Sequence, residues 1–336
     1  MRAPDFWRRR NGAAILLAPL GVLYGASVAL KARFARPFDA GLPVICVGNL
    51  TAGGSGKTPV AIAIAERLRA KDHKPFFLTR GYGGSERGPA MAARAHSAAQ
   101  MGDEALLLAR AAPTIVARDR AAGARLAKEK GATVLVMDDG HQNFALRKSL
   151  SLVVVDAAAG FGNGFQIPAG PLREPVAQGL SRADAVILMR SERSEDGRAA
   201  VHSGSVRTAP GGAPNLHNFS GPVLRAHLKV DGEAFAGKTV FAFAGIGRPE
   251  KFVASLEDSG AEVVGSCFFP DHHPYTEEEI VQLKAIAGEA QLVTTEKDFV
   301  RLTVADREGI RLLKAAALFD DPAALDGLLD RAAPAR

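Results

Sequence analysis

The segment ICVGNLTAGGSGKTPVAIAIAERL, residues 45–68, limits the possible folds more than any other part of the chain. An apolar run enters a glycine-rich loop, and a lysine, a threonine and a helix-forming stretch follow it. This order of strand, loop and helix is the context that a P-loop requires. The predicted phosphate-binding residues are Gly53, Gly54, Ser55, Gly56, Lys57 and Thr58.

Each residue type in this loop has a chemical reason to be there. Glycines let backbone N–H groups turn toward phosphate oxygens, and the positive end of the following helix favours their negative charge. Lys57 is expected to reach the β- and γ-phosphates of a nucleotide, and Thr58 to offer its hydroxyl to Mg²⁺. The strict pattern has a glycine where Thr51 stands, so a glycine-rich turn without a ligand is the alternative.

The apolar runs around this loop predict an α/β domain over residues 33–220. They are β-branched and almost continuously apolar, as expected for a parallel sheet that is covered on both faces. A helix is expected between the first two strands, with Pro59 tolerated in its first turn. The predicted strands are 43–49, 74–80, 113–117, 133–139, 150–156 and 184–189.

A second, smaller α/β domain is predicted over residues 221–336. A polar connection, 191–221, rich in Gly, Ser and Pro, precedes it. The GIG at 245–247 lacks the third glycine of a dinucleotide fingerprint, so no second nucleotide site is expected. Strands are expected at 238–247, 261–269, 290–298 and 310–319, and helices at 249–260, 276–289 and 322–332.

The N-terminus predicts a membrane-associated helix within residues 1–32. The 18 residues from Ala13 to Leu30 carry no charge, and basic residues flank both ends. A full span needs about 20 apolar residues, so this stretch is borderline, and Pro19 weakens it further. Trp7 and Tyr24 suit a membrane interface. The alternative is a buried first helix of a soluble domain.

Composition narrows the classes of partner and compartment. The formal net charge is +6, without one long basic run, which is compatible with a phosphate or a membrane surface and gives no reason to expect nucleic acid. The only cysteines, Cys46 and Cys267, lie in separate apolar runs. They provide neither a disulfide framework nor a zinc knuckle, and a reducing cytoplasmic compartment fits.

Two acidic pairs are candidates for chemistry. Asp138 and Asp139 end an apolar strand, where a P-loop protein needs a second magnesium ligand. Adjacent strand side chains point to opposite faces, so only one of the two is expected to face the metal directly. Asp103 and Glu104, at a loop-to-helix junction, could orient an acceptor hydroxyl, or could serve as an N-cap and a first-turn acid.

Three further stretches leave their roles open. Arg80 and Arg173 follow strands in LTRGYGG and PAGPLREP, and suit an anionic substrate as well as plain surface loops. In FPDHHPYT, Asp271, His272 and His273 could be a metal site, an acid/base pair or a polar loop end. TTEKDF is the nearest approach to the base-reading N-K-x-D of a GTPase, and its spacing argues against a GTP switch.

Taken in order, these motifs resemble the tetraacyldisaccharide 4'-kinase family from residue 4 to about residue 300. The matching stretches include APLGVLYG, VGNLTAGGSGKTP, LTRGYGG, GDEALLLA, PAGPLREP, FAGIGRPEKF, FPDHHPYT and TTEKD. The resemblance implies two α/β/α sandwich domains, P-loop NTPase-like and Rossmann-like, with the active site in the cleft between them. It also implies transfer of the γ-phosphate of ATP, with Mg²⁺, to a tetraacylated glucosamine disaccharide 1-phosphate, giving lipid IVA in lipid A biosynthesis. The N-terminal helix would attach the enzyme to the cytoplasmic face of the inner membrane.

The resemblance also implies roles for individual residues. Asp103 would be the catalytic base, assisted by His272. DDGHQN departs from the usual DDGFQH, because His141 replaces phenylalanine and Asn143 replaces histidine. Neither change removes a carboxylate, so magnesium binding should survive. Other motif positions near the active site are Arg80, Tyr82, Asp138, Asp139, Gln142, Arg173 and Glu174.

A second hypothesis comes from another class of protein. A membrane-attached P-loop ATPase could act as a switch or loading factor, with Asp271, His272 and His273 as a metal relay. Phosphate transfer that depends on lipid separates the two hypotheses.

Overall fold

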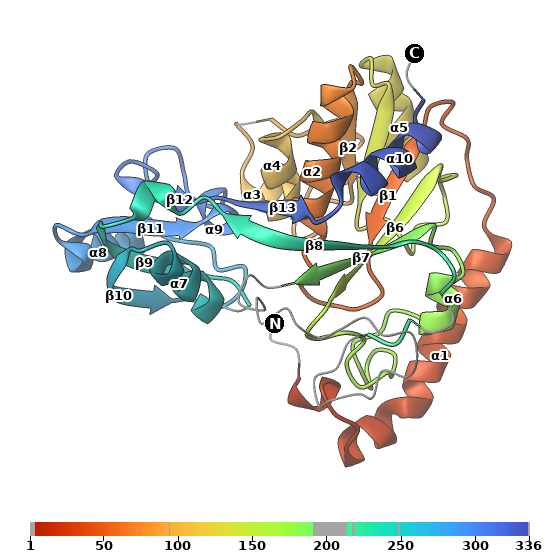
Figure 1. Cartoon of the computed structure of the whole chain (residues 1–336), viewed down its shortest axis with the longest axis horizontal. Coiled ribbons are helices and arrows are strands. Elements are labelled where there is room, and N and C mark those ends of the chain that lie inside the picture. Colours follow the sequence, from red (N-terminus) through yellow and green to blue (C-terminus); the bar gives the residue numbers. More distant parts are fainter. Residues whose placement is uncertain (1–3, 94, 191–213, 217–218, 248, 335–336) are drawn as a thin grey trace.

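Two separate β-sheets organise the chain in a computed structural model that describes residues 4–93, 95–190, 214–216, 219–247 and 249–334. Helices cover both faces of each sheet, and the smaller sheet lies to one side of the larger one (Figure 1). The expected α/β class, with a large parallel sheet and an apolar N-terminal helix, is confirmed. Most of the expected polar connection, 191–221, falls outside the described residues.

The larger sheet has nine strands in the order β13-β8-β7-β6-β1-β5-β2-β4-β3. All neighbours from β8 to β4 pair in parallel, and β13 and β3 are antiparallel at the two edges. The six expected strands of this region are confirmed as β1, β2, β4, β5, β6 and β7. The strands are β1 (Val44–Gly48), β2 (Pro75–Thr79), β3 (Ala90–Met91), β4 (Thr114–Val116), β5 (Val134–Asp138), β6 (Leu150–Asp156), β7 (Ala185–Arg190), β8 (Val223–Val230) and β13 (Ala315–Phe319).

The larger sheet is buried between two helical layers. One face packs against α2 (Lys57–Ala70), α4 (Asp103–Ala109) and α10 (Pro322–Ala332), and the other against α5 (Arg120–Glu129). Two short helices, α3 (Ala98–Met101) and α6 (Val176–Leu180), lie in the loops. Because β1 lies between β5 and β6, the chain leaves it at a point where the strand order changes direction. Ligands of open α/β sheets bind at such points, outside the carboxyl ends of the strands.

The smaller sheet has four parallel strands in the order β10-β9-β11-β12. One face packs against α7 and the other against α8, through Leu256 and Leu283 among others. A short α9 follows β11 directly. The elements are η3 (Glu233–Phe235), β9 (Thr239–Ala244), α7 (Pro249–Asp258), β10 (Glu262–Phe268), α8 (Glu277–Ala287), β11 (Gln291–Thr295), α9 (Glu296–Phe299) and β12 (Ile310–Leu313).

The single strand expected over 310–319 is two strands that belong to different sheets. The break falls at Lys314, and β13 then pairs antiparallel with β8 in the larger sheet. Helix α10 packs on the same sheet, where Asp326 pairs with Arg67 at 2.5 Å. Sheet membership therefore differs from the expected division, which placed all of 221–336 in a second domain. Figure 1 shows β8 and β13 running side by side and reaching from the larger sheet toward the smaller one.

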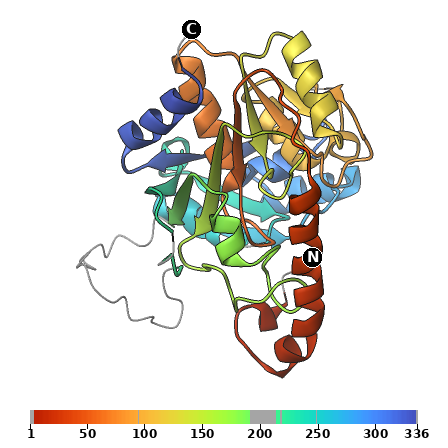
Figure 2. The same cartoon turned by 90° about the vertical axis from the view of Figure 1, so that its right-hand side faces the viewer.

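Helix α1 (Gly12–Phe34), preceded by η1 (Asp5–Trp7), packs on the protein along one side only. A Cβ added at Gly21 would lie 2.8 Å from the Gln166 carbonyl oxygen, so glycine permits this close approach. On the outside, Leu16 is 80% exposed and Leu23 67%. By length and composition α1 is able to cross a membrane, and only 17% of its most apolar window is buried. A buried first helix does not fit this exposure. Figure 2 shows α1 along the outside of the molecule.

Candidate active site

The glycine-rich loop joins β1 to α2 in the expected P-loop arrangement. Gly53 and Gly56 have φ of +115° and +83°, a region that favours glycine. Gly56 is the N-cap of α2 and provides no side-chain cap, which leaves the helix start open to an anion. Asn49 is fully buried and its amide donates to Thr51 O at 2.7 Å and Ser55 Oγ at 3.1 Å. Asn49 therefore fixes the loop, a role that the motif alone did not indicate.

The two neighbouring aspartates at the end of β5 have opposite environments. Asp138 is 2% exposed, its Oδ2 accepts a hydrogen bond from Thr58 at 3.3 Å, and its Oδ1 has no hydrogen-bond partner among the described residues. Burial, with the nearby Glu104 charge, raises the pKa of Asp138 to about 7. Burial also acts against the charge of Asp139, but Lys57 and Arg173 outweigh it and lower the pKa of that carboxyl.

Asp139 connects the P-loop lysine to the segment that follows β6. Its Oδ1 lies 3.7 Å from Lys57 Nζ and 2.7 Å from Arg173 Nη1. Asp139 has φ of +50°, which is uncommon outside glycine and is found at functional sites. The two carboxylates therefore face different groups, although Asp139 follows the last residue of β5 and its left-handed backbone, rather than strand alternation, sets its direction. Asp138 faces the P-loop threonine, whereas Asp139 faces two cations.

Glu174 lies beneath this site. It is fully buried, and its two oxygens accept hydrogen bonds from Gln142 at 2.8 Å and from Arg182 at 2.5 Å. The Gln142 amide also donates to Asn49 O at 2.9 Å. Through these hydrogen bonds, Glu174 and Gln142 connect the loop after β5 to Asn49, which fixes the P-loop. Sequence reasoning missed Arg182, whose only signal is an arginine eight residues after a buried acid.

Asp103 and His272 come together from the two sheets. His272 Nδ1 lies 2.8 Å from Asp103 Oδ2, across 169 residues of sequence. Gly102, not Asp103, is the N-cap of α4, so the Asp103 carboxylate is not used as a cap. Arg301, absent from the sequence predictions, also reaches Asp103 Oδ2, with Nε at 2.8 Å.

The charges in this cluster stabilise one another. Burial alone would raise the pKa of Asp103, but the His272 hydrogen bond and the Arg301 charge lower it below its ordinary value. The hydrogen bond to Asp103 in turn raises the pKa of His272. His272 has φ of +63°, a second strained residue at the site. The carboxylate therefore stays ionised near neutral pH beside the Arg301 cation, and its contact favours the protonated form of His272.

The other members of FPDHHPYT have different partners. His273 Nε2 lies 2.9 Å from Glu279 Oε2, and its ring stacks on Phe269 with the centroids 4.7 Å apart. Asp271 Oδ1 is 3.9 Å from His272 Nε2. Within the described ranges, no group of three or more His, Cys, Asp or Glu side chains is arranged to hold a metal ion. The three-residue metal relay considered above is therefore not assembled.

Arg80 and Tyr82 lie where β2 ends, beside the start of α4. A Cβ added at Gly102, next to Asp103, would lie 2.4 Å from Tyr82 O, so the two loops are in close contact. The Tyr82 side chain is 72% exposed and open to a large ligand. Arg120, buried behind them, has its pKa lowered to about 10 by burial and by the Arg80 charge. The nearby Asp139 and Asp138 charges act in the opposite direction and favour the charged guanidinium.

The two departures from the usual motif leave the acids intact. His141 is fully buried; its Nε2 lies 2.9 Å from Gly179 O and its Nδ1 3.1 Å from Ser151 Oγ. Burial lowers the pKa of His141 to about 4, so the ring is neutral at physiological pH. Nε2 then carries the proton, since it faces a carbonyl oxygen. Asn143 closes a turn by accepting a hydrogen bond from the Ala145 N–H at 3.1 Å.

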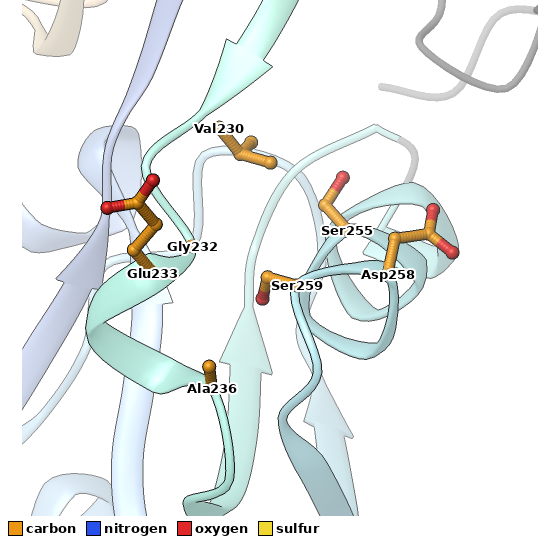
Figure 3. A pocket seen from close by; sticks show the side chains of 7 residues that line it. All are labelled: Val230, Gly232, Glu233, Ala236, Ser255, Asp258 and Ser259. Atoms are coloured by element: carbon orange, nitrogen blue, oxygen red, sulfur yellow. The ribbon is translucent and has the colours of Figure 1, made fainter.

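A cavity of about 310 Å³ lies elsewhere, between the end of β8, η3 and α7. None of the predicted site residues lines it, and it is open to solvent (Figure 3). The candidate site is instead defined by charged groups from the start of α2, the end of β5, α4 and the smaller sheet with its loops. The cavity is lined by Val230, Gly232, Glu233, Ala236, Ser255, Asp258 and Ser259.

Comparisons with known proteins agree over the whole chain. The family model described as tetraacyldisaccharide-1-P 4'-kinase matches residues 13–333. The tetraacyldisaccharide 4'-kinase of Paramagnetospirillum magneticum is 49% identical over 98% of both chains. That of Rhodospirillum centenum is 48% identical over 98% of this chain and 96% of its own. The crystal structure of LpxK from Aquifex aeolicus in complex with ATP has a TM-score of 0.72 and 25% identity, over 95% of this chain and 99% of that one.

Proposed function

This chain belongs to the tetraacyldisaccharide-1-P 4'-kinase family, and from that premise we propose how its residues carry out the reaction. It is a kinase of lipid A biosynthesis that phosphorylates the 4'-hydroxyl of a tetraacyldisaccharide 1-phosphate. ATP is the phosphate donor, which the ATP-bound relative supports. The product would be lipid IVA. The contact between Asp103 and His272 is the observation that carries the proposed mechanism.

The donor side of the site is built from the P-loop and β5. Backbone N–H groups at the start of α2 and the Lys57 ammonium would hold the phosphates of ATP. Asp138 Oδ1, which has no partner in the part of the chain that the structure describes, lies on the same carboxylate that Thr58 contacts and suits a hard cation, so these two side chains would hold Mg²⁺. Bound Mg²⁺ would neutralise charge on the phosphate oxygens. Asp139 would orient Lys57 and Arg173 rather than the cation.

The acceptor side is built around Asp103. We propose that its carboxylate accepts the proton of the 4'-hydroxyl while that oxygen attacks the γ-phosphorus and the bond to ADP breaks. His272 would hold the carboxylate in place through Oδ2. The smaller sheet with its helices would then act as a second domain that completes the site by presenting His272. The site lies at the contact between the two sheets, which fits a cleft between domains.

The remaining motif residues suit the lipid substrate. Arg80, Tyr82 and Arg173 lie at the edge of the site with charged or aromatic groups for a phosphorylated sugar. Gln142 and Glu174 would support the site from inside the protein, because Glu174 is fully buried and Gln142 donates a hydrogen bond to it. The lipid chains favour the bilayer by about 0.8 kcal/mol per CH₂, so the enzyme must work at a membrane. We infer attachment through α1 to the cytoplasmic face of the inner membrane, without nucleic acid as a partner.

Lipid-dependent phosphate transfer tests this function. Purified protein with Mg-ATP and the tetraacyldisaccharide 1-phosphate should give a bis-phosphorylated lipid, followed by mass spectrometry, together with one ADP per product. The control omits the lipid. ATP hydrolysis at the same rate without lipid, and no new phospholipid, would support the ATPase hypothesis instead.

Membrane attachment through α1 gives a second prediction. Leu16→Glu with Leu23→Glu should lower the vesicle-bound fraction, since each exposed leucine that no longer inserts reduces binding about tenfold. Deleting residues 1–32 should release the protein from membranes. Co-sedimentation with vesicles of phosphatidylethanolamine and phosphatidylglycerol measures both.

The matched control introduces the same charges on another exposed helix. Val281→Glu with Ile286→Glu, on α8, should leave binding unchanged, because both side chains are exposed far from α1 in sequence. If the α1 and α8 variants bind vesicles equally, α1 is not the attachment surface.

A further inference from the structure

The TTEKD motif, residues 294–298, has no part in the mechanism so far, yet its last residue organises the smaller sheet beside the active site. Asp298 is fully buried. Its Oδ1 accepts hydrogen bonds from Gly245 N at 2.9 Å and Tyr275 Oη at 2.9 Å, and its Oδ2 accepts one from Thr295 Oγ1 at 2.6 Å. It also accepts from Arg301 Nη1 at 2.8 Å. A buried carboxylate with four donors is held in one position.

Asp298 in turn fixes Arg301. The Arg301 side chain is 3% exposed, and its Nη1 also donates to Gly245 O at 2.8 Å. Both partners belong to the smaller sheet and its loops. The guanidinium plane is rigid, so two bonds at Nη1 determine where Nε and Nη2 point.

The other edge of the Arg301 guanidinium meets Asp103 from the larger sheet. Nε donates to Asp103 Oδ2 at 2.8 Å, and Nη2 lies 2.7 Å from the same oxygen without completing a second hydrogen bond. His272 Nδ1 reaches this oxygen as well. In the part of the chain that the structure describes, every side-chain hydrogen bond to Asp103 therefore ends on Oδ2, which leaves Oδ1 for a ligand.

Apolar and charged contacts next to this ion pair align the two segments. Val300 packs in one cluster with Met101 and Ala105, at the start of α4. Lys297 Nζ lies 3.7 Å from Glu104 Oε1. The segment from α9 to Arg301 thus docks on the first turn of α4 through packing and two ion pairs.

We propose that Arg301, held by Asp298, is a positioning residue for the catalytic base: it fixes Asp103 through Oδ2 and aims Oδ1 at the acceptor hydroxyl. This inference rests on the proposed role of Asp103. A base has to be within hydrogen-bond reach of the proton that it takes, so fixing the carboxylate raises the fraction of productive encounters. The TTEKD motif then contributes to catalysis from the second sheet without touching substrate.

The same contact controls the charge of the base. The groups that face Asp103 are His272, Arg301, the exposed Tyr82 loop and the neighbouring Glu104–Lys297 pair. Arg301 is the permanently charged member at hydrogen-bond distance. Without it, the burial of Asp103 is less well compensated, so the pKa of the carboxyl rises from its lowered value. The base works deprotonated, so the acidic limb of the rate profile must then move to higher pH.

The test is the pH dependence of kcat/KM for the lipid substrate. Arg301→Met should lower kcat about 10- to 100-fold and move the acidic limb upward by about one pH unit or more, with KM for ATP little changed. Arg301→Lys should recover part of both effects. Asp298→Asn should shift in the same direction as Arg301→Met. Thermal unfolding reports whether each variant is folded, and Arg301→Gln replaces Arg301→Met if the latter is not.

Arg307→Met is the matched control. Arg307 follows in the same segment but lies over the Phe299 ring, with its Nε 3.2 Å from Phe299 O. It should keep the wild-type profile. If a folded Arg301 variant keeps the wild-type acidic limb while Asp103→Asn is inactive, the inference about Arg301 is overturned and the proposed function still stands. Full turnover by Asp103→Asn would remove the proposed base, and the inference with it.

Discussion

Replacing Asp103 with asparagine is expected to lower kcat about 1000-fold, because the acceptor hydroxyl loses the carboxylate that takes its proton. Asparagine keeps the shape of the side chain but carries no charge for Arg301 and has no basic oxygen. ATP binding should persist, since the P-loop and Asp138 lie on other elements. Turnover with the lipid substrate and calorimetric titration with a non-hydrolysable ATP analogue measure the two parts separately.

Asp306→Asn is a suitable control for this change. Asp306 is an acid whose partner is Thr303, away from the site. It should retain wild-type turnover. If Asp103→Asn also retains it, another group is the base; if ATP affinity falls together with kcat, Asp103 acts on the donor side instead.

Replacing Asp138 with asparagine should have two large effects of opposite sign. Phosphate transfer should fall by about 100-fold or more, because the carboxylate proposed to hold Mg²⁺ is gone. Without Mg²⁺ and ATP, however, the variant should unfold at a higher temperature than the wild type. The fold buries this carboxylate with one oxygen that has no partner among the described residues, and an amide removes the cost of burying its charge.

The pH dependence of this gain follows from the pKa of Asp138. The folded-state value of about 7 lies above the ordinary 3.8, so folding favours the protonated carboxyl. That advantage is lost as pH rises from 3.8 to about 7, and above this range the wild type carries a cost on the order of a few kcal/mol. The stability difference from Asp138→Asn should therefore be largest above pH 7 and vanish near pH 4. Thermal unfolding scans across this range measure it.

Comparing Asp139→Asn with Asp138→Asn separates the effect of ion pairing on stability from the effect of burial. Asp139 has a lowered pKa because Lys57 and Arg173 outweigh its burial, so its loss should destabilise the protein at neutral pH. Equal stability changes for the two variants would show that their environments do not differ as the structure indicates.

The local sequence was sufficient to predict secondary structure wherever that structure depends on a short-range pattern of residues. From local pattern, the P-loop, α10 and the strands β1, β2, β4 to β7 and β9 to β11 could be predicted, because each combines an apolar period with glycine or proline boundaries. The break at Lys314 could not, because 310–313 and 315–319 are both strands and differ only in the sheet that each joins. Sheet membership depends on partners far away in the sequence.

The same limit applies to the site. Local sequence alone leaves Asp103 open between a helix-start acid and a base; the family resemblance suggested the base, and the contact with His272, 169 residues away, is visible only in the fold. Arg301 gave no local signal, because its importance comes from two carboxylates, Asp103 on α4 and Asp298 on α9, that are far apart in the sequence. Asn49 and Arg182 likewise act by fixing neighbours. Direct ligand groups follow motifs, whereas the residues that hold them are found only when the chain is folded.

The buried ring of His141 makes two distant positions depend on each other during evolution. Phenylalanine at 141, as in the usual motif, would remove the ring from Ser151 Oγ and from Gly179 O. The carbonyl keeps the Arg182 N–H at 3.3 Å, so the cost, about 1–3 kcal/mol for an unsatisfied buried group, falls on the Ser151 hydroxyl. We therefore expect serine at 151 to be tolerated best in relatives that also carry histidine at 141. Residues 141 and 151 should therefore covary among relatives. A sequence motif that requires phenylalanine at 141 would miss chains whose catalytic acids are unchanged.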